Sequence, residues 1–457
     1  MLRRRVQLLE GSMSAPVVAG APGGIPLLGH ALSLRDDPLP FLESLRDIGD
    51  IVQIKLGPQR AYVLNSAELA RDVLVAKQRC FDKGPQIQAA RGLLGDGLIS
   101  SEGDVHRRHR LLMQPAFRRD RIAEYAQIMR EQIVEQTDAW CAGQVLDLRV
   151  EMTALTLAVT GKTLISSDLG EELVAEMQHS MPRIFDLIHQ RLTSLPVLNR
   201  LPLARNREYA ALLARLHPMI DKVVAEYRGS DTGEPDLLAM LFDARDAETG
   251  KAMSHKEIHD QIMAILMAGS ETTAAALSWV FHVLTEHPDI EGRLHAEVDR
   301  VLDGRPAEYA DARQLTYTAQ VISEVLRCYP PAWIITRRAT EEVELTGHRI
   351  PAGASVIISP YVVQRDPRLF ADPNTFDPDR WSPERAGQIH RDSILQFGGG
   401  ARKCIGDVFG VIEATLALAT IAARWRLIAT PGVTVEKVAR TTFTPRNLLL
   451  TLEKRHA

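Results

Sequence analysis

One helical pattern of unusual length constrains what this chain can fold into. Ser254-His255-Lys256-Glu257 is a capping box, and apolar residues continue at helical spacing from there to His287, where Pro288 ends the pattern. A helix of about 33 residues is roughly 50 Å long, so it crosses any compact domain that contains it. The core must therefore be built around this helix.

The middle of the same helix carries the polar cluster Ala268-Gly269-Ser270-Glu271-Thr272-Thr273. Such groups are costly to bury unless they are hydrogen-bonded, so they need a reason to be there. A mid-helix threonine such as Thr272 often hydrogen-bonds to its own helix.

The rest of the chain is mostly helical. Amphipathic helices are predicted over residues 107–141 and 171–228, and a β-hairpin is predicted over residues 50–64 around Gly57-Pro58. Further strands are predicted only late, at residues 343–345, 354–359 and 434–452. The fold class is therefore mainly α with minor β.

The length of 457 residues exceeds the roughly 250–300 residues at which one hydrophobic core usually stops growing, which favours several domains. However, no linker, repeat or low-complexity tract divides the sequence. We therefore predict a flexible extension over residues 1–20 and a single domain over residues 21–457.

Charge and cysteine content exclude several classes of protein. A formal charge of −4 gives no reason to expect a nucleic-acid partner. The most apolar window, residues 408–425, is interrupted by Glu413 and Arg424, and the N-terminus lacks the apolar stretch of a signal peptide. The four cysteines lie far apart, as free thiols of a reducing cytoplasm do. We expect a cytoplasmic protein without a membrane span.

The glycine-rich loop Phe397-Gly398-Gly399-Gly400-Ala401-Arg402-Lys403-Cys404-Ile405-Gly406 precedes an apolar helix. Glycines allow sharp turns and close approach to a flat ligand. A cysteine at a helix N-terminus is stabilised as thiolate, the form that binds metals. Taken alone, such a cysteine is more often an inert structural thiol.

This loop resembles the haem-binding loop of cytochrome P450, F-x-x-G-x-R-x-C-x-G, at every fixed position. The resemblance implies the cytochrome P450 fold, a helix-rich prism with small β-sheets, and haem b (iron protoporphyrin IX) as cofactor. It implies that Cys404 ligates the iron and that Phe397, Gly398 and Gly406 contact the cofactor.

Two further segments resemble P450 motifs in the right order. Residues 268–273 resemble the oxygen-activating motif A-G-x-(D/E)-T-(T/S), which makes Glu271 and Thr272 the catalytic acid and alcohol and places Ala268 and Gly269 against the haem. Glu324 and Arg327 match E-x-x-R, and with Arg380 they are expected to form a buried ion-pair network of structural role. Without the other motifs, this i, i+3 pair would not indicate such a network, because similar pairs are common on solvated helix faces.

The haem propionates are expected to bind four side chains. His106 and Arg110 match an H-x-x-x-R pattern where many relatives have W-x-x-x-R, and Arg337 and Arg402 match the remaining positions. Guanidinium groups suit carboxylates. Arg338, next to Arg337, is an alternative for that place. Because His106 stands where many relatives have Trp, the details of its hydrogen bond to the propionate stay open.

The resemblance covers nearly the whole chain and implies a monooxygenase that inserts one atom of O2 into a substrate. Residues 22–30, 258–261 and 333–339 resemble soluble bacterial members that oxidise sesquiterpenes, the pentalenene and epi-isozizaene oxygenases. The expected substrate is a small apolar terpenoid. By analogy with the family, apolar segments at residues 262–268, 332–335 and 442–444 are expected to line the substrate pocket. A steroid, fatty acid or macrolide is the alternative substrate.

Ferredoxin and ferredoxin reductase are the electron donors that the resemblance implies, and the protein is expected to be a monomer. Arg107, Arg108, Arg118, Arg119 and Arg121 are predicted to form a basic patch for an acidic ferredoxin. Two other classes stay open. A peroxide-using or isomerising thiolate-haem enzyme often lacks the acid and alcohol pair, and a non-enzymatic haem sensor needs no proton relay.

Overall fold

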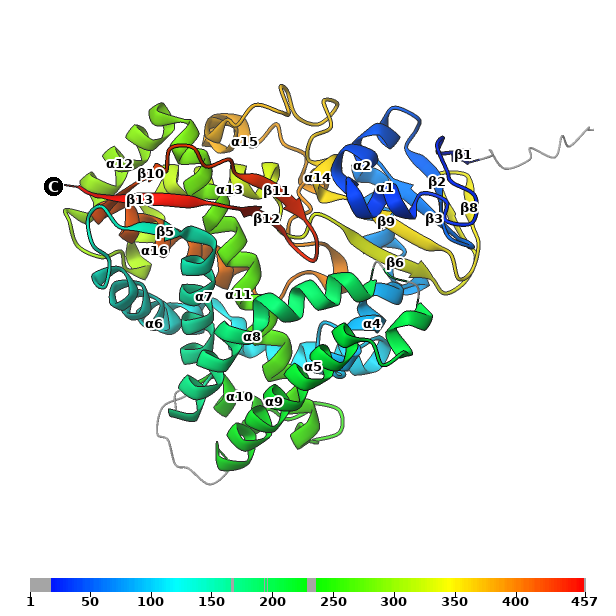
Figure 1. The fold of residues 1–457 in the computed structure, drawn as a ribbon, viewed down its shortest axis with the longest axis horizontal. Helices are drawn as coiled ribbons and strands as arrows, with labels where there is room; N and C mark the ends of the chain where they lie inside the picture. The colour runs from blue at the N-terminus through cyan, green and yellow to red at the C-terminus, as the bar shows by residue number, and fades with distance from the viewer. Residues whose placement is uncertain (1–17, 166–167, 193, 195, 228–235, 456–457) are drawn as a thin grey trace, which may run out of the picture.

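Helices form most of the molecule in the computed structural model, which describes residues 18–165, 168–192, 194, 196–227 and 236–455 (Figure 1). The helices are α1 (Ala31–Asp36), α2 (Pro38–Arg46), α3 (Ala67–Arg71), α4 (Gly84–Leu94), α5 (Gly103–Met113), α6 (Arg119–Asp138), α7 (Leu148–Leu164), α8 (Asp168–Leu192), α9 (Ala204–Tyr227), α10 (Leu237–Asp243), α11 (His255–Glu286), α12 (Pro288–Leu302), α13 (Thr316–Cys328), α14 (Pro360–Val363), α15 (Pro383–Ala386) and α16 (Asp407–Arg424). The mainly α prediction is confirmed.

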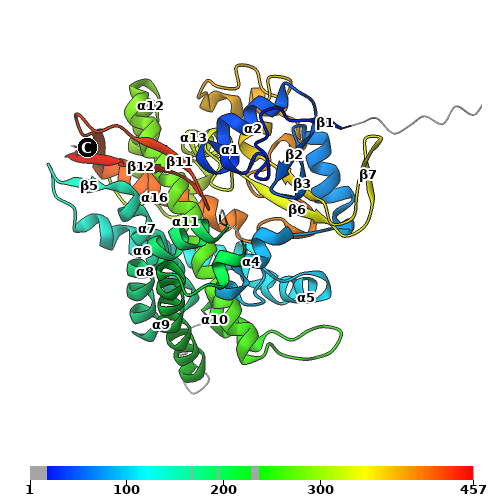
Figure 2. The same ribbon diagram turned by 45° about the vertical axis from the view of Figure 1, so that its right-hand side comes forward.

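The strands form small sheets that join distant parts of the chain. They are β1 (Ala19–Gly20), β2 (Ile51–Leu56), β3 (Gln59–Leu64), β4 (Phe81–Asp82), β5 (Val145–Asp147), β6 (Ile335–Ala339), β7 (Val343–Leu345), β8 (His348–Ile350), β9 (Ser355–Ile358), β10 (Trp425–Ala429), β11 (Glu436–Ala439), β12 (Phe443–Arg446) and β13 (Leu449–Lys454). The largest sheet has the order β1-β2-β3-β9-β6-β4, and it lies at the upper right, above α4, in Figures 1 and 2. The smaller sheets are β10-β13-β5, β11-β12 and β7-β8.

The predicted hairpin over residues 50–64 is confirmed as the antiparallel pair β2–β3. The predicted extension needs a correction, because Ala19 and Gly20 form β1 and pair in parallel with β2. Residues 1–17 of that extension lie outside the described residues. That residues 21–457 form a single domain stays a prediction.

Helices form in both of the stretches predicted to be amphipathic helices, and each stretch is divided into two of them. Between α5 and α6 the chain makes a 3-10 turn, Gln114–Phe117, because Pro115 cannot donate the backbone hydrogen bond that a continuous helix needs. In the same way α8 ends at Leu192 and α9 begins only at Ala204, with Pro196 and Pro202 between them. Apolar periodicity alone does not reveal such a break, because the spacing resumes beyond it.

Helix α11 confirms the prediction of a long central helix. The Ser254 hydroxyl accepts from the Glu257 backbone N–H at 3.2 Å, and the Glu257 carboxylate accepts from the Ser254 backbone N–H at 2.7 Å. α11 is long and apolar enough to cross a membrane by composition, but 67% of its most apolar window is buried inside the protein. It is therefore a core helix, and it runs through the middle of the molecule (Figure 2).

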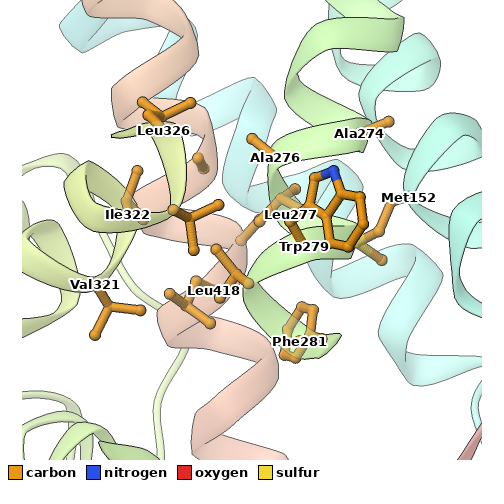
Figure 3. Packing of buried hydrophobic residues seen from close by; sticks show 14 of the residues in the cluster. Met152, Ala274, Ala276, Leu277, Trp279, Phe281, Val321, Ile322, Leu326 and Leu418 are labelled. Atoms are coloured by element: carbon orange, nitrogen blue, oxygen red, sulfur yellow. The ribbon is translucent and has the colours of Figure 1, made fainter. Parts of the chain in front are cut away.

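The core surrounds the C-terminal half of α11. Trp279 is fully buried, and Figure 3 shows Leu277 of the same helix facing Leu418 of α16, with Ile322 of α13 nearby. Met152 of α7 packs on the other side. Apolar side chains from four helices thus fix α11 against α7, α13 and α16, and this fixes the position of its polar middle segment.

The predicted Glu324–Arg327–Arg380 network is confirmed and is buried. The Arg327 guanidinium donates to both carboxylate oxygens of Glu324, at 2.8 and 2.7 Å, and Arg380 Nε lies 3.4 Å from the same carboxylate. Trp381 Nε1 donates to it at 2.9 Å. The network joins α13 to the 3-10 turn Pro378–Trp381, far along the chain.

Candidate active site

The glycine-rich loop before α16 holds Cys404 in a tight turn. Gly398 and Gly400 adopt φ of +67° and +65°, and a Cβ on Gly400 would lie 2.1 Å from the Leu74 carbonyl oxygen, so this position requires glycine. The Cys404 backbone N–H donates to the Phe397 carbonyl at 2.9 Å and closes the loop. The loop residues predicted from the sequence therefore form one turn around the cysteine.

The Cys404 side chain is accessible, although surrounding protein raises the pKa of its thiol above the ordinary value. The Gly406 backbone N–H donates to the sulfur and opposes that shift, because it favours the thiolate. α16 begins at Asp407, so the sulfur lies just before a helix N-terminus. These features suit a thiolate that binds a cation.

The first turn of α16 lies against the polar segment of α11. A Cβ on Gly410 would lie 3.5 Å from the Thr273 hydroxyl, in ordinary van der Waals contact. This contact brings the helix that follows Cys404 to the residue after Thr272. Two motifs separated by more than a hundred residues in the sequence therefore meet in one region.

Within the largely buried α11, Ala268 and Thr272 are exposed, which marks an internal space beside the helix. Residues four apart share a helix face, so both line the same side. The Thr272 hydroxyl donates to the Ala268 carbonyl at 2.8 Å, the helix bond expected of a mid-helix threonine. Gly269 points elsewhere, because a Cβ there would lie 2.9 Å from the Thr160 hydroxyl of α7.

Glu271 faces a different side of α11 from Thr272. Successive helical residues differ by about 100° around the axis, which separates the two side chains. The Thr442 hydroxyl donates to one Glu271 carboxylate oxygen at 2.5 Å, and the other oxygen is buried without a hydrogen-bond partner among the described residues. Burial raises the pKa of Glu271 to about 7, with the Thr442 hydrogen bond opposing the shift. The carboxyl group is thus able to gain and lose a proton near neutrality.

A cluster of cations lies near the Cys404 loop. Arg402 pairs with Glu102 at 2.8 Å and donates to the Gln78 and Phe81 carbonyls at 2.9 and 2.8 Å. Arg337 is buried in β6, and burial and the nearby Arg402 charge lower its pKa to about 10. The structure thus brings two of the predicted propionate ligands together.

Lys83 belongs to the same cluster, although the sequence analysis did not single it out. Its ammonium donates to the Leu98 and Ser101 carbonyls, both at 2.8 Å, and burial lowers its pKa to about 7. Its sequence context, Asp82-Lys83-Gly84, resembles an ordinary solvated turn and gives no signal of burial.

His106 and Arg110 complete the predicted set on α5. Burial first, and then the Lys83 charge, lower the pKa of His106 to about 3, so its imidazole is neutral at physiological pH. Arg110 donates to the Lys403 carbonyl, which ties α5 to the cysteine loop. Arg338, the alternative to Arg337, points to the other face of β6 and donates to Asp82 through Nε at 3.0 Å.

The residues present fit a haem. The charges of Arg337 and Arg402 help to lower the pKa of Lys83, and Arg402 also lowers that of Arg337, whereas Glu102 is the carboxylate that pairs with Arg402 in the described part of the chain. Buried cations need anionic partners, and two propionates would supply them. Cys404, Ala268 and Thr272 are each exposed, on a loop and a helix that the Gly410–Thr273 contact brings into one region.

The predicted basic patch is largely neutralised, which corrects that expectation. Arg108 donates to the carboxylate of Glu257 and to the Ala252 carbonyl, the latter at 2.9 Å, and Arg107 lies 3.3 Å from Glu248. Arg118 and Arg121 pair with the neighbouring residues Asp120 and Glu124, at 3.4 and 2.6 Å. Glu257 and Glu248 lie far from these cations in sequence, whereas Asp120 and Glu124 lie within three residues of them.

Comparison with known proteins supports the same assignment. The profile of the family described as Cytochrome P450 matches residues 20–455. Cyclooctatin synthase from Streptomyces melanosporofaciens is 50% identical over 91% of this chain and 91% of its own length. Cyclooctat-9-en-7-ol 5-monooxygenase from the same organism is 41% identical over 95% and 96%, and pentalenene oxygenase from Streptomyces avermitilis is 41% identical over 96% and 98%.

The fold agrees with a solved structure. The crystal structure of the cytochrome P450DA heme domain superimposes with a TM-score of 0.87 at 25% sequence identity, covering 96% of this chain and 98% of that one. The family profile spans nearly the whole chain, and the cysteine loop and cation cluster fit its cofactor. The chain therefore belongs to the cytochrome P450 family and is an oxygen-dependent haem monooxygenase.

Proposed function

We propose that this enzyme inserts one oxygen atom of O2 into a terpenoid, with electrons from ferredoxin and ferredoxin reductase. The observation that carries the proposal is the set of full-length relatives, two of which are named for cyclooctat-9-en-7-ol and pentalenene. The proposal also includes a monomeric protein in the cytoplasm, for which the free cysteines and the bacterial relatives are the support.

The side chains beside the internal space agree with an apolar substrate. Ile265 and Ala268 on α11 and Ala332 and Ile334 after α13 are at least partly accessible there. Other members of the predicted apolar segments belong to the core, because Ile262, Met263, Ala264, Leu266 and Phe443 are buried. Periodicity identifies apolar residues but does not separate pocket walls from core.

Each predicted site residue has a task in this proposal. Cys404 holds the iron as thiolate, and His106, Arg110, Arg337 and Arg402, with Lys83, hold the propionates. Bound haem supplies oxygen activation and insertion into the substrate. The remaining residues predicted from the sequence shape the loop and the helix around the haem. They are Phe397, Gly398, Gly406, Ala268 and Gly269.

We assign proton transfer to the side chains of Thr272 and Glu271. The Thr272 hydroxyl lies on the face of α11 that borders the internal space, and a hydroxyl that donates to a carbonyl still accepts through its lone pairs. Glu271 faces a different side of α11, where one carboxylate oxygen accepts from Thr442 and the other is buried without a partner among the described residues.

Thr272→Ala is expected to retain haem and substrate binding but to divert most reducing equivalents to hydrogen peroxide. The product formed per NAD(P)H should fall by roughly tenfold or more, because general acid–base groups typically contribute that much or more. Ser278→Ala is the matched control, since Ser278 also donates to its own helix, at 2.7 Å to Ala274, but is buried away from the site. Equal coupling in both variants would leave Thr272 as a helix residue without a special task.

Terpenoids are expected to shift the Soret band from low to high spin at low micromolar concentration, whereas fatty acids, steroids and macrolides bind more weakly. Pentalenene and cyclooctat-9-en-7-ol are the first ligands to titrate. Product formation is then measured with NAD(P)H, ferredoxin and its reductase. Tight shifts only with acidic or glycosylated ligands would contradict the terpenoid proposal, and equal turnover with peroxide alone would contradict the ferredoxin route.

A further inference from the structure

A cavity of about 340 Å³ with both polar and apolar walls lies beside Glu271, and Thr272 is not among the residues that line it. Its walls come from α7, α8, α11 and the β11–β12 hairpin, and they carry Arg149, Asp186, Glu271, Arg440 and Thr442. A cavity of this size has room for several water molecules, and the charged and hydroxyl groups in its walls can hydrogen-bond to them. It is distinct from the face that Ala268 and Thr272 border.

The inner end of the cavity is the Glu271 carboxyl group. One oxygen accepts from Thr442, and the second is buried without a partner among the described residues. A buried carboxylate oxygen without a hydrogen bond is costly, and cavity water is the group available to satisfy it. The unsatisfied oxygen therefore points to ordered water at this end.

The outer end is an ion pair across the mouth. Asp186 of α8 and Arg440 of the hairpin are 2.6 Å apart, with side chains 44% and 39% exposed, so both contact solvent. The hairpin itself is fixed, because Trp333 Nε1 donates to the Arg440 carbonyl at 2.7 Å and Trp279 Nε1 donates to the Phe443 carbonyl at 3.0 Å. Asp186 is thus held at the boundary between cavity and bulk water.

We infer that the protons used by Glu271 enter through this cavity, with Asp186 as the outer proton carrier, Arg440 positioning Asp186, and Thr442 positioning Glu271. The inference rests on the proposed function, because it assigns a source to the protons that Glu271 and Thr272 deliver. Each catalytic cycle consumes two protons, and each of them passes from bulk water to Asp186, through cavity water to Glu271, and onward, after which both carboxyl groups return to carboxylates. No electrons are transferred in this path.

Electrostatics around Glu271 agree with this arrangement. The groups that face it from neighbouring elements are Arg149 of α7, Asp186 of α8, and Arg440 and Arg446 of the hairpin. The Asp186 charge raises the pKa of Glu271, whereas the Thr442 hydrogen bond and the Arg149 charge lower it. Changing either Asp186 or Thr442 should therefore move the titration of Glu271 in a known direction.

The decisive variants are Asp186→Asn and Asp186→Glu, with Arg183→Gln as control. Arg183 lies on the same helix and pairs with Glu208 at 2.6 Å with similar exposure, but it does not line the cavity. Asp186→Asn should lower turnover about tenfold and enlarge the solvent deuterium isotope effect, with an unchanged substrate-induced spin shift. Asp186→Glu should restore most of the rate, and the control should match the wild type.

A second readout does not depend on turnover. The infrared carboxyl signal of Glu271, identified by its loss in Glu271→Gln, should titrate at lower pH in Asp186→Asn and at higher pH in Thr442→Val. An unchanged rate and isotope effect in Asp186→Asn, with Thr272→Ala still uncoupled, would overturn this inference alone. Full coupling in both Thr272→Ala and Glu271→Gln would overturn the acid–alcohol assignment and this inference with it.

Discussion

Glu324→Gln is expected to lower the free energy of unfolding by roughly 3–5 kcal/mol, the loss typical of removing one partner from a buried ion pair. The Glu324 side chain is fully buried and accepts from Arg327, Arg380 and Trp381. Glutamine keeps the shape but leaves two buried guanidinium groups without a carboxylate. Its amide nitrogen also cannot accept the hydrogen bonds that one oxygen accepts now.

The loss should extend to the haem site. Gln364 donates to the Leu326 carbonyl at 3.1 Å and accepts from the Leu395 backbone N–H at 2.8 Å, so it links α13 to the segment before the cysteine loop. Arg327 in turn donates to the Gln364 carbonyl at 2.9 Å. A loosened network would therefore weaken haem retention as well as stability.

Arg293→Gln is the matched control for this prediction. It removes the bidentate pair with Asp379, next to Arg380 in sequence, but both side chains are about half exposed. Exposed ion pairs contribute up to about 1 kcal/mol. Equilibrium unfolding in urea with linear extrapolation measures both variants. Equal losses in the two would show that burial of the Glu324 network adds nothing.

The sequence predicted the parts of the protein that follow local rules. The capping box and apolar spacing predicted α11, and the glycines and Cys404 predicted the turn before α16, because both depend on residues close together in the chain. The order of the motifs added Glu324, Arg327 and Arg380, which the structure joins. The sequence is sufficient to predict a structure that depends only on residues close together in the chain.

Contacts between distant segments were not predictable in this way. Thr442 reaches Glu271 across 171 positions of the chain, and Lys83 enters the cation cluster from a turn that resembles a solvated one. The same limit explains the wrong prediction of a basic patch, since Arg108 is neutralised by Glu257, 149 positions away. Only strand alternation in the folded sheet separates the buried Arg337 from the exposed Arg338.

Cys404→Ala is expected to abolish thiolate ligation and with it monooxygenase activity. Alanine has no ligand atom, and the remaining cysteines do not belong to the loop before α16. The cation cluster of Lys83, Arg337 and Arg402 is unchanged, so these residues would still hold the propionates of any haem that binds. Activity should fall by more than a hundredfold, because the thiolate favours cleavage of the O–O bond.

Cys141→Ala is the control, because Cys141 is exposed and follows α6, away from the loop. It should retain haem and activity at wild-type levels. Haem content measured separately from the ligation signature distinguishes a lost ligand from a failure to fold. Far-ultraviolet circular dichroism of the Cys404→Ala protein should show the helix content of the wild type.

The spectrum of the reduced, carbon monoxide-bound protein tests the haem-thiolate assignment most directly. Wild type and Cys141→Ala should show the red-shifted Soret band of a thiolate-ligated haem, and Cys404→Ala should lose that band while it keeps its helical fold. A Cys404→Ala protein that still shows the red-shifted band would contradict the assignment of Cys404 and the active site built around it.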